Sequence, residues 1–69
     1  MTIGERIRLV RQKKGLSQKQ LAEKSGVNIK SLNRYELGTS VPPSDSLKAI
    51  SDTLEVSSDH LLSDEDTID

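Results

Sequence analysis

Lys30, Asn33 and Arg34 lie close together in the sequence, and on a helical wheel they share one broad face, away from Leu32. Such a face would present an amide and two cations. Lysine and arginine can bond O6 and N7 of guanine, and asparagine can pair with N6 and N7 of adenine. The spacing therefore fits a helix that reads the edges of bases, although an ordinary solvated helix face would have the same pattern.

Glu36 falls near the buried side of the same wheel, where a carboxylate is costly without a partner. Arg11 follows Ile7 by four residues and so shares the inward face of an N-terminal helix. We predict an Arg11–Glu36 ion pair that ties the two helices together, since the guanidinium can meet a carboxylate with two hydrogen bonds. Two separate surface charges are the alternative, and charged ends more than about 6 Å apart would contradict the pair.

The sequence contains few residues suited to catalysis or to metal binding. There is no cysteine, and the single histidine, His60, follows Asp59 directly, so the two side chains point about 100° apart on a helix. The carboxylates of Asp64, Glu65 and Asp66 lack the spaced oxygen ligands and glycine of a calcium loop. We therefore expect no enzyme activity, no cofactor and no metal, and we interpret residues 64–69 as a frayed acidic tail.

The helices that must position these residues have clear starts. Thr2 with Glu5 and Ser17 with Gln20 match the capping box, in which two side chains satisfy the free N–H groups of a helix start. Apolar pairs typical of a hydrophobic staple flank Ser17, and the same spacing recurs around Asn28 and Ser57.

The ends of these helices are equally clear. The prolines 42 and 43 must end any preceding helix, so that Ser44 starts another. Glycines that could adopt a left-handed conformation stand at the expected helix ends, at positions 15, 26 and 38. The sequence predicts an all-α fold without strands, a compact bundle of five helices at about 2–14, 17–25, 28–37, 44–54 and 57–62. Helices 17–25 and 28–37 have the outline of a helix-turn-helix.

Size and charge set further limits. The chain has 69 residues and a formal net charge of −1, which alone argues against a nucleic-acid partner. However, residues 1–38 hold nine basic and three acidic residues, and residues 39–69 hold one basic and eight acidic residues. The helix-turn-helix thus lies in a positive half of the chain. Tyr35 is the only aromatic residue, so stacking of several bases is not expected.

The same features bear on domain organisation and location. We expect one domain over residues 1–63, followed by the acidic tail. The absence of cysteine fits a reducing cytoplasm, and no apolar run approaches the length that spans a membrane.

The chain resembles the helix-turn-helix domains of lambdoid phage repressors and Cro proteins, the XRE-type regulators. The resemblance covers about residues 3–62, nearly the whole chain. It is carried by Arg11, Gly15, Leu16, Ser17, Gln18, Leu21, Ala22, Gly26, Val27, Leu32, Tyr35, Glu36, Gly38, Pro43, Ser44, Leu47, Ile50, Leu54, Val56, Ser57, Leu61 and Leu62. It implies a five-helix domain that binds double-stranded operator DNA, with helix 28–37 in the major groove.

The resemblance also implies roles for individual residues. Gln18 would contact a phosphate or a base at the groove edge, with Lys19 beside it at the phosphates. Thr39 and Ser40 would belong to a phosphate-contacting loop at 38–43. Arg11 and Glu36 match the buried pair of the family. The reading positions on the second helix would be Asn28, Ile29, Lys30, Asn33 and Arg34. Ser31 lies among them and would contact the DNA backbone or the neighbouring helix.

Two positions depart from the family pattern. Glu55 stands where glycine or asparagine is frequent, so we expect a strained or differently shaped turn there. Loop 38–43 lacks the basic residue often found in it.

The leading hypothesis is a transcriptional repressor of phage, prophage or bacterial type that binds a palindromic operator as a homodimer. The resemblance implies that the two protomers would meet through helix 57–62 and the loop before helix 44–54. The alternative is an antitoxin-like or other protein-interaction module, in which the acidic half binds a basic protein.

Overall fold

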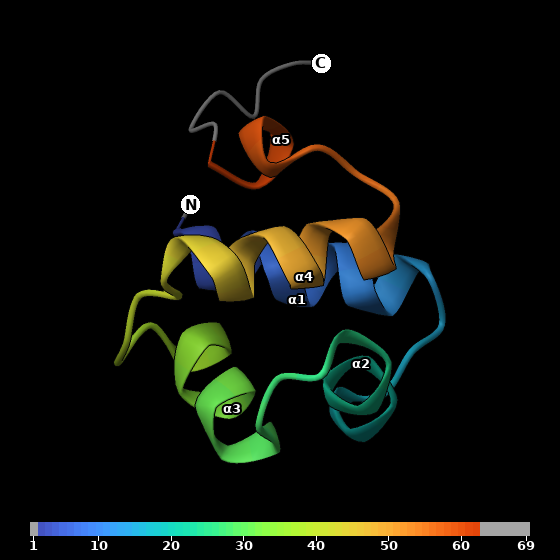
Figure 1. Ribbon diagram of the computed structural model, residues 1–69, viewed down its shortest axis with the longest axis horizontal. Coiled ribbons are helices and arrows are strands. Elements are labelled where there is room, and N and C mark those ends of the chain that lie inside the picture. Colours follow the sequence, from blue (N-terminus) through green and yellow to red (C-terminus); the bar gives the residue numbers. More distant parts are fainter. Residues whose placement is uncertain (1, 63–69) are drawn as a thin grey trace.

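The computed structural model describes residues 2–62 and contains helices without strands over that range, as the sequence predicts (Figure 1). The acidic segment 64–69 lies outside the described residues. Each helix falls within a predicted range, and the ends agree to within one residue because a capping residue itself lies outside its helix. The five helices are α1 (Ile3–Lys13), α2 (Gln18–Ser25), α3 (Ile29–Leu37), α4 (Ser44–Leu54) and α5 (Ser58–Leu62).

The helix starts follow the predicted capping chemistry. The hydroxyls of Thr2 and Ser17 each accept the backbone N–H of the residue three positions later, and the side chains of Glu5 and Gln20 bond back to the capping residues. Both capping boxes are therefore complete. By contrast, α4 begins after Pro43 without a side-chain cap, so the preceding prolines rather than a hydroxyl define its start.

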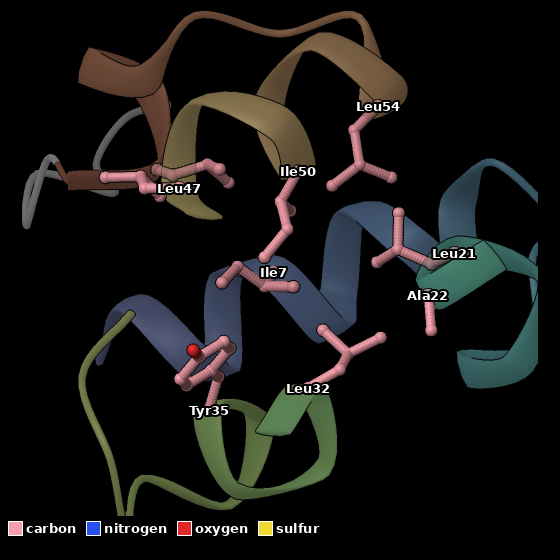
Figure 2. Close-up of a cluster of buried hydrophobic side chains, with 9 residues drawn as sticks. Ile7, Leu21, Ala22, Leu32, Tyr35, Leu47, Ile50 and Leu54 are labelled. Atoms are coloured by element: carbon pink, nitrogen blue, oxygen red, sulfur yellow. The ribbon is translucent and has the colours of Figure 1, made fainter. Parts of the chain in front are cut away.

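Helices α1 and α4 lie side by side in the middle of the molecule, with α2 and α3 on one side of them and α5 on the other (Figure 1). Ile7 of α1 is completely buried at the centre, between Ile50 of α4 and Leu32 of α3 (Figure 2). Apolar side chains of α1, α3 and α4 thus face one shared core. Its other members are Leu21, Ala22, Tyr35, Leu47, Leu54 and Leu61.

Gly4 allows α1 and α3 to approach closely. A Cβ atom at this position would overlap the backbone carbonyl oxygen of Tyr35 and press on the Cα of Glu36. Because both obstacles are backbone atoms, a side-chain rotation cannot make room. The absence of a side chain at residue 4 therefore helps to set the distance between α1 and α3.

The turn between α4 and α5 has the unusual backbone conformation that the sequence predicts at Glu55. Glu55 has φ +62°, a left-handed conformation, and it is the only residue other than glycine with a positive φ in the part of the chain described. Its N–H donates to Asp52 O over 3.1 Å, and Val56 N–H donates to Ser51 O over 3.0 Å. These two bonds close the end of α4, so the turn forms although its sequence is unfavourable.

Candidate nucleic-acid interface

The turn between α2 and α3 is built by one glycine and one asparagine. Gly26 ends α2 with φ +77°, which a residue with a side chain would adopt only under strain. Asn28 then caps α3, because its Oδ1 accepts the N–H groups of Lys30 at 2.8 Å and Ser31 at 3.4 Å. The Asn28 oxygen is thereby committed to the helix start, which leaves its amide nitrogen to meet a ligand.

The central predicted reading residues come together on one surface. Gln18 from the start of α2 lines an open hollow with four residues of α3, namely Ile29, Lys30, Asn33 and Arg34. All four of these α3 side chains are exposed, whereas Gln18 is half-buried. The hollow is therefore lined by two amides, one aliphatic side chain and two cations. We call these five residues the reading surface.

Beneath the reading surface, Arg11 and Glu36 form the ion pair that their helix faces predict. Arg11 Nε lies 2.7 Å from Glu36 Oε2, and Arg11 Nη2 lies 3.0 Å from Glu36 Oε1, so the contact is bidentate. The two side chains are only 11% and 2% exposed. Arg11 Nη1 also donates to Leu16 O over 2.8 Å. The pair thus connects α1, α3 and the segment that enters α2.

Gln18 extends this network to the surface, and the sequence offered no sign of it. Its Nε2 donates to Glu36 Oε1 over 3.0 Å and to Asn33 Oδ1 over 3.3 Å. The contacting residues are 18 and 15 positions apart, so only the packing of α2 against α3 brings them together. A buried carboxylate is therefore in direct contact with one member of the reading surface, which in turn bonds a second.

The remaining predicted contact residues lie around the edge. Lys19 is exposed beside a second hollow, which Ile29 also borders. Ser31 is half-buried and does not line the hollow of the reading surface. In the loop after α3, Thr39 donates its hydroxyl to Arg34 O over 3.2 Å and so caps that helix, whereas Ser40 is half-buried.

Other kinds of site are not seen within residues 2–62. No three histidine, cysteine or acidic side chains in that range gather as metal ligands would. No helix in the same range has the length and apolar character needed to cross a membrane. His60 is exposed on the short helix α5.

Comparisons with known proteins agree with this geometry. The chain is 39% identical over 62 residues to the HTH-type transcriptional regulator ImmR of Bacillus subtilis, covering 90% of this chain and 49% of ImmR. The P22 c2 repressor in complex with a synthetic operator superimposes with a TM-score of 0.84 at 34% identity, covering 90% of this chain and 94% of that one. SinR of Bacillus subtilis, a master regulator for biofilm formation, was solved in complex with DNA. It superimposes with a TM-score of 0.86 at 40% identity, covering 90% of this chain and 100% of the SinR chain.

The chain spans about half the length of ImmR. The helix-turn-helix family model matches residues 7–61, which include α2, α3 and most of the described core. Because this match covers well over half of the chain, and the solved relatives share the arrangement of all five helices, the chain belongs to the helix-turn-helix family of XRE-type regulators.

Proposed function

We propose that this protein is a sequence-specific DNA-binding transcriptional regulator, a repressor that inserts α3 into the major groove of its operator. The observation that carries the proposal is the reading surface, where two exposed cations and one exposed amide of α3 adjoin Gln18 at the start of α2. In a helix-turn-helix, the second helix occupies the major groove and its exposed side chains contact base edges. The Arg34 guanidinium is suited to O6 and N7 of guanine.

Phosphate contacts would flank this helix. Lys19 and the backbone N–H groups in the first turn of α2 can bind phosphate oxygens, since a helix start presents donors and a positive dipole end. Lys30 supplies a further cation. In loop 38–43, Ser40 is better suited than Thr39, because the Thr39 hydroxyl proton is already donated to a backbone carbonyl.

The protein would act as a homodimer on a palindromic operator. Two-fold pairing places two recognition helices about 34–36 Å apart, which is one turn of DNA. We assign the dimer surface to α5 and the loop before α4. In support, Leu37 at the end of α3 and Val41 in this loop are 65% and 78% exposed, more than most large apolar side chains of the described chain. A regulator of this kind needs no cofactor or enzyme activity, and it would work in the cytoplasm, where the DNA is.

The decisive experiment is selection of binding sites from random duplexes, followed by affinity measurements on the selected operator. We expect symmetric half-sites one DNA turn apart. Arg34→Ala should weaken binding by about 1–3 kcal/mol and relax the preference at one base pair. Lys48→Ala is the matched control, because Lys48 is an exposed cation of α4 that pairs with Asp52 outside the reading surface. Equal losses in both variants would contradict the assigned role of Arg34.

The second candidate is a protein-interaction module, and the exposed acidic residues of α4 and α5 favour it. Asp45, Asp52 and Asp59 are all exposed. A basic partner protein could bind this half without using the reading surface. Failure to bind any duplex at low salt, where phosphate contacts are strongest, would favour this second function.

A further inference from the structure

Both oxygens of Glu36 act as acceptors, and this determines how the Gln18 amide is turned. Oε2 accepts from Arg11 Nε at 2.7 Å, and Oε1 accepts from Arg11 Nη2 and Gln18 Nε2, each at 3.0 Å. An ionised carboxylate has no proton to donate. If the Gln18 amide turned over, its oxygen would face the oxygen of Glu36 at hydrogen-bond distance. The nitrogen of Gln18 must therefore point inward and its oxygen away from the carboxylate.

The same reasoning determines the orientation of the Asn33 amide. The Nε2 group of Gln18 has two hydrogens, one donated to Glu36 and one to Asn33 Oδ1 at 3.3 Å. With its amide reversed, Asn33 would place a nitrogen donor against the nitrogen donor of Gln18. Over residues 2–62, Gln18 Oε1 and Asn33 Nδ2 make no hydrogen bond to the protein. These two atoms belong to side chains that line the same hollow.

We propose that Glu36 sets the hydrogen-bond polarity of the reading surface, so that Gln18 offers DNA an acceptor and Asn33 offers it donors. This inference rests on the proposed function. Phosphate oxygens are acceptors, so the Gln18 side chain does not bind a phosphate while the network is intact. Its oxygen accepts a hydrogen bond from an exocyclic amino group, N6 of adenine or N4 of cytosine. The Asn33 nitrogen donates a hydrogen bond to an acceptor on a base, such as O6 or N7 of guanine or O4 of thymine.

Glu36 is thus a positioning residue for specificity as well as a structural one. A solvated glutamine or asparagine amide can present either its oxygen or its nitrogen to a base. Here the buried carboxylate removes that choice at one position, and Gln18 transmits the orientation to the next. The specificity of two positions on the surface therefore depends on a residue that is 4% exposed and lies beneath them.

The test compares Glu36→Gln with Arg11→Lys in binding-site selection. Both variants break the bidentate pair, but only Glu36→Gln removes the carboxylate next to Gln18. The new amide can face Gln18 with either a donor or an acceptor. We expect the base preference at the positions facing Gln18 and Asn33 to fall about fivefold or more in Glu36→Gln. Arg11→Lys should keep the wild-type preference, whatever its stability. Equal preferences in the two variants would overturn the proposal.

Gln18→Met provides a second variant in case Glu36→Gln does not fold, because it leaves the Arg11–Glu36 pair intact. It should broaden the preference at the base pair that faces Asn33 by a similar factor, since Asn33 loses the donor that orients it. An unchanged preference at that base pair would count against the relay from Gln18 to Asn33.

A measurement on the free protein separates the inference from the proposed function. The side-chain amide hydrogens of Gln18 should exchange with water more slowly in NMR spectra than those of Gln20, whose oxygen rather than nitrogen is used in its cap. Equal exchange in the two glutamines would overturn the polarity even if the protein selects an operator. A wild-type protein that selects no duplex would overturn the proposed function, and the reading role of both amides with it.

Discussion

Glu55 has backbone strain that glycine would relieve. A side chain in the left-handed conformation costs about 1–2 kcal/mol, because Cβ approaches a carbonyl oxygen. The compensating contact is weak, since Glu55 Oε1 lies 3.7 Å from Lys14 Nζ and the two side chains are 79% and 41% exposed. The backbone conformation therefore dominates the energetics of this residue.

We predict that Glu55→Gly raises the free energy of unfolding by about 0.5–1 kcal/mol, after allowance for the greater entropy of glycine in the unfolded chain. Urea denaturation followed by circular dichroism measures it. Glu55→Ala is the control, because it also removes the contact with Lys14 but keeps a Cβ atom. An equal gain in both variants would show that charge, not backbone strain, is responsible.

Packing of α1, α2 and α3 depends on the Arg11–Glu36 pair, in which the Glu36 side chain is 2% exposed. We predict that Arg11→Met lowers the free energy of unfolding by about 3–5 kcal/mol, since it leaves a buried charge without its cation. The double variant Arg11→Met, Glu36→Leu should recover part of this loss, because it removes that charge as well. Thermal and urea unfolding of the three proteins measure the difference.

No recovery in the double variant would contradict this account. The loss would then arise from the shape of the arginine and its bond to Leu16 O, not from the uncompensated carboxylate.

The helices could be predicted from the sequence because their signals are local. Thr2 and Ser17 start helices through hydrogen bonds to residues three positions away. A helical wheel was enough to predict that Glu36 lies on the inward face of its helix. The bond between Gln18 and Asn33 could not be predicted, since it depends on how two helices cross. The close approach at Gly4 was missed for the same reason: no local pattern shows that a backbone lies against residue 4.

At the scale of the whole molecule, the two halves of the sequence differ in charge, and the arrangement of the helices places this difference on separate surfaces. The reading surface and Lys19 lie on α2 and α3, whereas α5 packs on the other side of α1 and α4 (Figure 1). The molecule is 31 Å long, and charges in physiological salt are screened over about 8 Å. DNA bound at α3 would therefore sense the nearby cations far more than the net charge of −1.

This screening predicts different effects for two substitutions that each change the charge by one unit. Lys19→Gln should reduce the slope of log affinity against log salt by about 0.9, because one phosphate contact and its released counterion are lost. Asp59→Asn should leave the slope unchanged near 0.15 M salt, since Asp59 is exposed on α5, and α5 lies across α1 and α4 from α3 (Figure 1). Fluorescence anisotropy with the selected operator over a series of salt concentrations measures both slopes. If Asp59→Asn shifts the slope as much as Lys19→Gln, the net charge of the protein controls DNA binding, and separate charged surfaces do not.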